Sequence, residues 1–419
     1  MQMKTLKIAI IGGGASGLMA AIIAAKNGAK VDIWERNERI GKKILATGNG
    51  KCNFSNKDLS IQHYHSNDKK VLTAVLNQFG FQDTEVFFHE LGMMIRSKDT
   101  LLYPFSEQAS TVLDVLRYEI ADLGIQVLCE KLVSDIQILK DGRFKVISSS
   151  YTDVYDKVIL TCGGKAAPKS GSDGMGYKLA SKLGHKTTKL CPGLTGLKVS
   201  DKEFKMIAGV RSQVKLSLFI NGEFMAEEKG ELQLTDYGVS GIAVFQLSRI
   251  AGMSLNSQNE VSLYVDLCPE LELEALKLLL QKKKVQFENR SLDAYLSGFL
   301  NKKLGMYFAK KLGLSLHALM KDIKNEQLYQ LANLCKNWKL SIIDINSYEQ
   351  AQVTAGGLCF SQIDEDLQSK LHKGLYFAGE ILDVDGNCGG YNLQWAWSSG
   401  YVAGYSASNH SSGHSGDKR

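Results

Sequence analysis

The chain has 419 residues, which is too long for one compact core, so two or three domains are expected. Its composition, 44% hydrophobic and 22% charged, is that of a globular protein, and its formal net charge of +6 is small and spread out, which argues against a nucleic-acid-binding surface. No apolar run reaches the roughly 18 residues of a membrane span, and the start lacks a signal-peptide pattern. A cytoplasmic location is the default expectation.

The eight cysteines lie far apart in the sequence, which argues against zinc sites and redox dithiols and favours reduced thiols. Asp383, Asp385 and Asn387 begin like a calcium loop, but Gln394 stands where such a loop needs a ligating acid. We therefore predict no metal site.

The first structured segment is predicted to be a strand, a turn and a helix. Residues 8–11 form a short apolar run typical of a buried parallel strand, and residues 18–25 carry the helix. Between them Gly12, Gly14 and Gly17 form G-x-G-x-x-G, whose glycines allow a tight turn, the approach of a pyrophosphate and close packing of the helix. This context predicts a dinucleotide site on the helix N-terminus.

A second apolar run, residues 29–34, ends at Glu35, where an acid is expected to accept the ribose hydroxyls. A carboxylate there disfavours a 2′-phosphate, so the nucleotide is expected to be FAD or NAD rather than NADP. A surface ion pair is the alternative role for Glu35.

The next segment, residues 36–56, is rich in glycine and lysine. Exposed backbone N–H groups and lysine charges can wrap an anionic cofactor, although a solvated loop has the same composition. Further on, helical or strand patterns cover residues 71–88, 107–123, 125–129, 132–149 and 154–161.

Residues 158–164 run from a strand into glycines, as expected for a strand returning to the nucleotide. From about Cys191 the character changes, with strand patterns at 214–224, 231–234 and 261–266, followed by leucine- and lysine-rich helices over 271–339. We interpret the lysine runs 282–284 and 302–303 as a solvated helix face, with a binding patch as the alternative.

Residues 374–404 repeat the strand–glycine–helix pattern of the first structured segment. A short strand ends at Gly379 and Glu380, and Gly390 precedes a helix from Tyr391 to about Gly404. Distant parts of the chain are therefore expected to close on one cofactor. Residues 406–419 are small and polar and are expected to form a flexible tail.

Four segments together resemble one known family: residues 41–56 (GKKILATGNGKCNFSN), 158–177 (VILTCGGKAAPKSGSDGMGY), 352–357 (QVTAGG) and 374–404. They are similar to the BaiN-like bacterial NAD(P)/FAD-dependent flavoproteins, whose relatives include aminoacetone oxidase. The resemblance implies an α/β fold, a glutathione-reductase-type FAD-binding Rossmann domain with an inserted β-barrel plus helical domain. It implies that residues 1–190 and 347–405 form the FAD domain and 191–346 the insert.

The resemblance also implies FAD as the cofactor and assigns residues to it. The pyrophosphate is expected on the glycine turn, adenine on the backbone of Val133, the ribityl chain on Glu380, and the pyrimidine edge of the flavin at Gly390. The full set is Gly12, Gly14, Ala15, Ser16, Gly17, Glu35, Arg36, Lys43, Thr47, Gly48, Asn49, Gly50, Lys51, Cys52, Asn53, Val133, Thr161, Cys162, Gly163, Gly379, Glu380, Gly390, Tyr391, Asn392 and Leu393.

The electron donor and the substrate side are less defined. Because only one G-x-G-x-x-G follows a strand, no separate NAD(P)H domain is expected, and NADH or NADPH is a candidate transient donor that docks over the flavin. Thr354, Gly357 and Tyr391 are candidate substrate contacts. Tyr391 is also a candidate proton donor, with packing as its alternative role, and no residue is assigned as catalytic.

The expected function is an FAD-dependent oxidoreductase that reduces a small or flat organic substrate with NAD(P)H. The alternatives are an oxygen-using amine oxidase, a flavoprotein of RNA modification and a non-catalytic flavin-binding protein. No membrane or nucleic-acid partner is expected, and the oligomeric state is open. Relatives often carry T-H-x-G-x-S-G-P where residues 235–242 read TDYGVSGI. Because Asp236 and Ile242 replace the histidine and the proline of that motif, the relatives' substrate is not assigned to this chain.

Overall fold

The computed structural model describes residues 5–409, which divide into two compact units. Unit 1 contains the described residues up to Cys191 and from Gln352 onward, and unit 2 is Pro192–Ala351. The short strand β12 (Cys191–Gly193) straddles the division. None of the helices in the described residues is long and apolar enough to cross a membrane.

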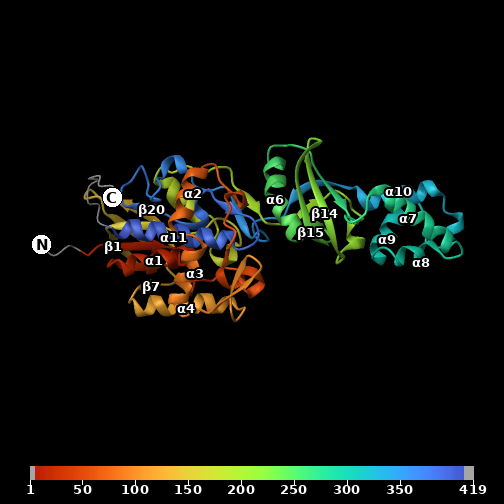
Figure 1. Ribbon diagram of the computed structural model, residues 1–419. Coiled ribbons are helices and arrows are strands. Elements are labelled where there is room, and N and C mark those ends of the chain that lie inside the picture. Colours follow the sequence, from red (N-terminus) through yellow and green to blue (C-terminus); the bar gives the residue numbers. More distant parts are fainter. Residues whose placement is uncertain (1–4, 410–419) are drawn as a thin grey trace. The chain divides into compact units, whose positions relative to one another are not determined.

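Unit 1 is built on a five-stranded parallel sheet (Figure 1). Four of its strands are buried over most of their length, as their apolar runs predict, whereas the edge strand Gln126–Leu128 is only partly buried. Their spatial order is β20 (Leu375–Phe377), β11 (Lys157–Leu160), β1 (Lys7–Ile11), β2 (Lys30–Trp34) and β7 (Gln126–Leu128). The sheet therefore joins the first strand to one near the end of the chain, which gives the predicted Rossmann fold.

Two helices far apart in sequence, α1 (Ala15–Lys26) and α11 (Tyr391–Ser408), pack against each other beside this sheet (Figure 1). Small residues allow the close approach, because a Cβ on Gly404 would lie 2.5 Å from the Ala20 carbonyl oxygen. Helix α11 runs to Ser408 and thus continues into the segment that we expected to be a tail; residues 410–419 lie outside the described part.

The remaining helices of unit 1 correct one prediction. Residues 71–88 do not form one helix, because Gly80 interrupts it and begins a second helix with its N–H bonded to Asp83 Oδ2 at 2.8 Å. The helices are α2 (Lys69–Gln78), α3 (Phe81–Glu90), α4 (Ala109–Asp122) and α5 (Met175–Lys182).

Small antiparallel sheets complete unit 1. The predicted strand 154–161 is two strands in different sheets, since the chain leaves β10 (Thr152–Tyr155) and enters β11 of the parallel sheet. The others are β3 (Ser55–Asn56), β4 (Tyr64–His65), β5 (Ile95–Lys98), β6 (Leu101–Pro104), β8 (Val133–Ile138), β9 (Phe144–Ser148), β19 (Val353–Ala355) and β21 (Asp385–Gly386).

Unit 2 contains a closed barrel of six strands, as the expected insert requires. Alternate residues such as Val214, Leu216 and Leu218 fill its interior. Around the barrel the order is β13 (Leu197–Val199), β16 (Gly238–Ser240), β15 (Glu223–Leu234), β14 (Arg211–Ile220), β17 (Val261–Asp266) and β18 (Trp338–Ile345), and α6 (Ile242–Leu255) packs on it.

The helical part of unit 2, residues 267–337, corrects the expectation of evenly spread charge. It holds 12 Lys and Arg against seven Asp and Glu, a net charge of +5 out of +6 for the whole chain. These residues lie between two barrel strands, so the chain gathers them into one compact region. The helices are α7 (Leu273–Gln286), α8 (Leu292–Ser297), α9 (Lys302–Lys311) and α10 (Asn325–Lys336).

Candidate functional site

The turn between β1 and α1 has the contacts that a phosphate-binding turn needs. A Cβ on Gly17 would lie 2.0 Å from the Gly12 carbonyl oxygen, and one on Gly12 would lie 2.6 Å from that of Thr161, so neither position tolerates a side chain. A Cβ on Gly14 would meet nothing within 4 Å. The turn is therefore closed where it packs on protein and open at Gly14.

The N-terminus of α1 lies at the same place. No side chain caps it and no acid stands in its first turn, so the first N–H groups, including those of Ala15 and Ser16, remain without intrahelical partners. The Ser16 hydroxyl donates to the Ala378 carbonyl oxygen at 3.4 Å. Helix dipole and free N–H groups together favour an anion.

Glu35 directly follows β2 and is 6% exposed. Its Oε2 accepts from the Gly13 N–H at 2.9 Å, and its Oε1 accepts from the backbone and side chain of Asn37 at 2.8 and 2.7 Å. The carboxylate therefore fixes the glycine turn. Its predicted contact with a ribose stays a prediction.

The segment predicted to wrap the cofactor is an irregular 3₁₀ region, η1 (Ile44–Gly50), followed by Lys51, Cys52 and Asn53. Gly48 and Asn49 have positive φ and break the helix in two. Thr47 Oγ1 donates to the Ile44 carbonyl oxygen at 2.6 Å. Cys52 is fully buried, and burial raises the pKa of its thiol to about 12, which makes it a packing residue rather than a nucleophile.

An ion pair connects this segment with the end of the chain. Lys43 Nζ lies 2.6 Å from Glu380 Oε2, and Glu380 Oε1 accepts from the Thr354 N–H at 2.7 Å. Both charged side chains are less than one-third exposed. Residues separated by more than 300 positions in the sequence thus meet next to Gly379. A Cβ added at Gly379 would lie 2.3 Å from Ser16 Oγ.

The N-terminus of α11 is the second helix end of the predicted site. It begins after Gly390, which has a φ of 89° and would place a Cβ 2.6 Å from the Ser55 carbonyl oxygen. No side chain caps this helix and its first turn has no acid. Asn392 holds the preceding loop by bonds of 2.8 Å to the N–H and carbonyl of Gly386, while Leu393 packs on the core.

Tyr391 opens α11 and is 5% exposed. Its ring stacks on His63 with centroids 4.6 Å apart, and His63 Nε2 lies 3.0 Å from Asp58 Oδ2. Burial, followed by the charge of Asp58, raises the pKa of Tyr391 to about 12, so its hydroxyl stays protonated at neutral pH.

The residues predicted for the adenosine side lie at the ends of β8 and β11. Val133 begins β8, and Thr161 Oγ1 donates to the Gly12 carbonyl oxygen at 2.7 Å. Burial raises the pKa of the neighbouring Cys162 to about 12. Next to Gly163, the buried Ser172 hydroxyl has no hydrogen-bond partner among the described residues.

Arg36 pairs with Asp173 at 2.5 Å. Burial by itself would raise the pKa of the Asp173 carboxyl, but hydrogen bonds from Arg36 and from the Met175 N–H hold it below its ordinary value. The pair fixes the segment before α5 beside the end of β2.

Two of the three candidate substrate contacts also make close contacts within the protein. The Thr354 side chain is fully buried and accepts from the N–H groups of Lys165 and Ala166 at 2.7 and 3.0 Å. A Cβ on Gly357 would lie 2.3 Å from the Leu382 backbone. The substrate contacts of Thr354, Gly357 and Tyr391 stay predictions.

Sequence reasoning missed His63 and Ser172. His63 belongs to no motif and meets Tyr391 only through the tertiary fold. Ser172 lies in the motif segment 158–177, but only the fold shows that its hydroxyl is buried beside Gly163 with no partner among the described residues.

Sequence reasoning also missed Gln394, which is fully buried and whose Oε1 accepts from the hydroxyls of Ser55 and Thr84 at 2.5 and 3.1 Å. Its position one turn into α11 was the only signal.

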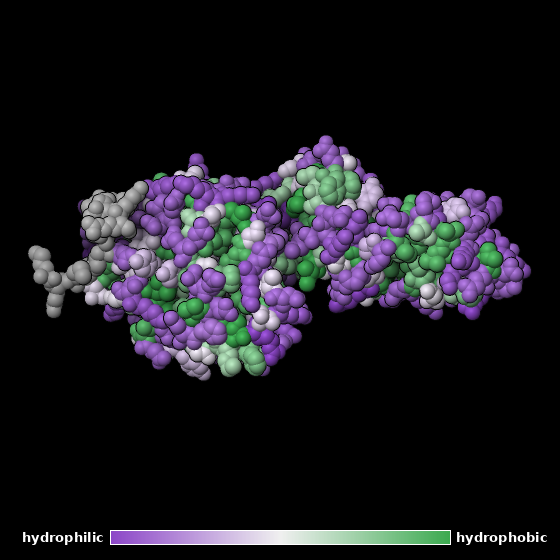
Figure 2. Space-filling view, in the orientation of Figure 1, coloured by the Kyte–Doolittle hydropathy of each residue, from purple (hydrophilic) through white to green (hydrophobic). Residues whose placement is uncertain are grey.

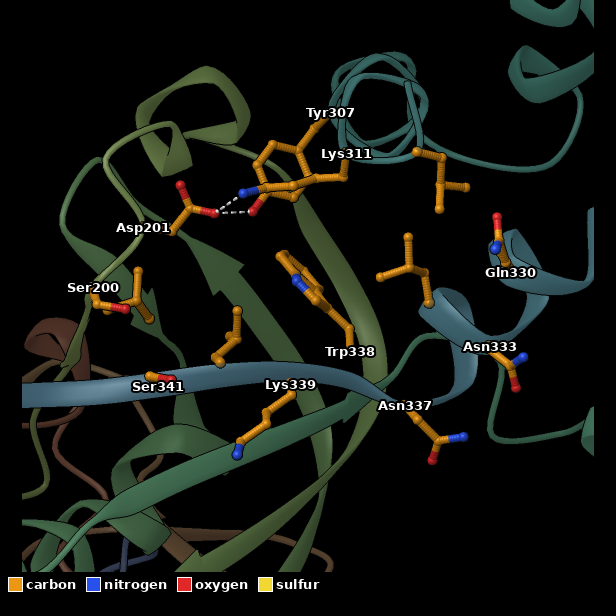
Figure 3. A pocket seen from close by; sticks show the side chains of 14 residues that line it. Ser200, Asp201, Tyr307, Lys311, Gln330, Asn333, Asn337, Trp338, Lys339 and Ser341 are labelled. Atoms are coloured by element: carbon orange, nitrogen blue, oxygen red, sulfur yellow. Dashed lines mark hydrogen bonds and ion pairs between the residues drawn. The ribbon is translucent and has the colours of Figure 1, made fainter. Parts of the chain in front are cut away.

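A cavity of about 670 Å³ lies in unit 2, between β18 and the helices α9 and α10, and contains none of the predicted residues (Figure 3). In Figure 3 Tyr307 and Lys311 point toward Asp201, whose Oδ2 lies 2.5 and 2.7 Å from their terminal atoms. Asp201 and Lys311 therefore neutralise each other, and Nζ of Lys339, which also lines the cavity, lies 3.6 Å from Glu260 Oε1.

The site of unit 1 fits FAD on three independent features: the open position at Gly14, two uncapped helix N-termini without acids, and an unpartnered buried hydroxyl at Ser172. Together with the parallel sheet, these define an FAD-binding protein of the Rossmann type. The model of the family described as HI0933-like protein Rossmann domain matches residues 6–406. The chain belongs to this family of FAD-dependent oxidoreductases, as the sequence motifs predicted.

Relatives with described activities match nearly the whole chain. The 3-dehydro-bile acid delta(4,6)-reductase of Clostridium scindens is 39% identical over 96% of this chain and 98% of its own length. The ribosomal RNA dihydrouridine synthases of Haemophilus influenzae and Escherichia coli are 28% and 26% identical, over 95% and 96% of this chain and 98% and 97% of their own lengths.

Proposed function

We propose that this protein is an FAD-containing reductase that uses NAD(P)H to saturate a carbon–carbon double bond conjugated with a carbonyl group. The relatives' names support this chemistry, because a 3-oxo steroid with unsaturation at C4 and a uracil ring share that arrangement. The substrate is thus a flat unsaturated carbonyl compound, free or within a larger molecule.

The observation that carries the proposal is the pair of acid-free helix N-termini, at Gly14 and at Gly390. Bound FAD would supply the two-electron chemistry, and the protein would supply position and electrostatics. We assign the α1 end to the pyrophosphate and the α11 end to the flavin ring edge that becomes negative on reduction.

Other residues orient this arrangement. Glu35 holds the glycine turn, and the Lys43–Glu380 pair holds the glycine-rich segment against the end of β20. The Tyr391 hydroxyl, protonated at neutral pH, is the candidate group to deliver a proton to the substrate.

Anaerobic stopped-flow tests the proposal. We expect loss of flavin absorbance when NADH or NADPH is mixed with the holoprotein, and its return when a 4-en-3-one or a uridine-containing RNA is added. Anaerobic reduction of the flavin by an amine, followed by formation of peroxide when oxygen is admitted, would replace the proposal with an oxidase. A protein that retains no FAD after reconstitution would refute it.

A further inference from the structure

Only some of the positively charged side chains of the helical part are paired with carboxylates. Four of its lysines are paired with carboxylates: Lys277 with Glu274, Lys310 with Glu203, Lys311 with Asp201, and Lys336 with Asp266. The cations without such partners in the described residues gather mainly at one place. That place is the end of α7 together with the short helix η5 (Met320–Asp322).

Backbone hydrogen bonds bring these two segments together. The Lys321 N–H donates to the Glu288 carbonyl oxygen and the Met320 N–H to that of Arg290, both at 2.9 Å. Lys284 Nζ lies 3.3 Å from Asn325 Oδ1. We call this the α7–η5 surface and define it by six residues: Lys283, Lys284, Phe287, Arg290, Lys321 and Lys324.

Phe287 gives this surface an aromatic centre. Its ring is half-buried, with the Arg290 guanidinium 4.3 Å and Lys283 Nζ 5.5 Å from its centroid. Both cations lie over the ring, so the Arg290 guanidinium covers it, and a guanidinium supported by an aromatic ring can itself stack on a flat base next to a phosphate. The exposed acids nearby, Glu288, Asp322 and Glu326, are fewer than the five cations.

Two features distinguish this surface from a pocket for a small anion. Its cations spread over two segments and converge on no described cavity, while the two lysines that line the cavity of unit 2, Lys311 and Lys339, are paired with Asp201 and Glu260. Hydrophilic side chains also dominate the visible face of the helical part around a smaller apolar area (Figure 2). An extended polyanion therefore matches the surface better than a single phosphate.

We propose that the α7–η5 surface docks an RNA chain, with the lysines on its phosphates and the Arg290 guanidinium, supported by Phe287, stacked on an unpaired base. The inference deepens the proposed function and rests on it for one point, that the docked RNA carries the base to be reduced. It replaces our expectation from the sequence that no nucleic acid is involved. Docking on the same chain as the flavin site raises the effective concentration of the substrate.

The test compares two charge-reversed holoproteins of equal net charge. One carries Lys283→Glu, Lys284→Glu and Lys321→Glu. The control carries Lys98→Glu, Lys140→Glu and Lys178→Glu, exposed positions of unit 1 that form no ion pair with another described residue. A fluorescein-labelled RNA stem–loop is titrated by anisotropy at several salt concentrations. Flavin content and Tm show that each protein is folded.

We expect the first variant to lose at least tenfold in affinity and to lower the salt slope by about two, at about 0.7–0.9 per lost phosphate contact, while the control changes affinity about twofold. Phe287→Ala should weaken binding severalfold with the salt slope unchanged. Equal losses in both variants would overturn the surface as an RNA site, as would binding to phosphatidylglycerol vesicles instead of RNA. Because these readouts need no turnover, failure of flavin reduction by NAD(P)H would refute the proposed function separately.

Discussion

The turn at the start of α1 and the α7–η5 surface are both suited to phosphates, but they achieve this differently. The turn uses backbone groups. A Cβ added at Gly17 or at Gly12 would lie 2.0 or 2.6 Å from a carbonyl oxygen, and the first turn of the helix carries no charged side chain. The α7–η5 surface uses side chains, of which four are exposed and Lys284 and Phe287 are partly buried. A single substitution should therefore abolish binding at the turn and only weaken it on the surface.

The largest effect is expected from Gly17→Ala. Its methyl group would press on the Gly12 carbonyl oxygen at 2.0 Å, where backbone cannot move aside, so we expect a loss of about 3 kcal/mol or more in stability and loss of FAD. Calorimetry of the apoprotein and flavin stoichiometry measure both effects.

Gly14→Ala is the matched control for that change. Its Cβ meets no protein atom, so the apoprotein should keep its Tm while FAD affinity falls because the methyl group occupies the phosphate position. Equal Tm losses in the two variants would show that the open position at Gly14 is not a ligand cradle.

Tyr391→Phe tests the proton donor. We expect the flavin to be reduced by NADPH at an unchanged rate and the transfer to the unsaturated substrate to slow by about 10²-fold, the usual contribution of a general acid. Because the pKa of Tyr391 is raised to about 12, the native rate should stay level up to about pH 10, where an ordinary tyrosine begins to ionise. Equal slowing of both half-reactions would mean that Tyr391 only packs on His63.

These expectations separate what the sequence predicts from what it does not. Local rules identified the glycine turn, Glu35 and the α11 N-terminus, because each depends on residues close in sequence. They did not predict the role of Thr354, whose hydroxyl is consumed by two backbone N–H groups, or the stacking of His63 on Tyr391. The charge of the helical part was visible in the sequence, yet only the fold shows that η5 brings Lys321 beside the end of α7.

A moderate effect is expected from the Lys43–Glu380 pair. Lys43→Met and Glu380→Gln should each reduce FAD affinity, and the double variant should lose less than the sum, with a coupling energy of about 1 kcal/mol. Equilibrium FAD titrations of the four proteins measure the coupling. Strict additivity would show that the pair does not act as a unit.

A smaller and pH-dependent effect is expected at Asp173. Its pKa is lower in the folded protein than the ordinary 3.8, so ionisation stabilises the fold; this contribution is present above about pH 4 and is lost as the pH falls through the folded pKa. Asp173→Asn should therefore be less stable than the native protein at pH 6, and denaturant titrations should show this difference shrinking as the pH is lowered below about 4. A difference that stays constant over this range would exclude the Arg36 pair as its cause.

The smallest effect should come from one lysine of the α7–η5 surface. Lys283→Gln removes an exposed charge without a carboxylate partner, so stability should change by less than about 0.5 kcal/mol. The salt slope of RNA binding should fall by about 0.7–0.9 and the affinity severalfold at most, because the remaining cations still hold the phosphates. A complete loss of binding would mean that Lys283 makes one specific contact, and the surface would then resemble the glycine turn of α1 rather than contrast with it.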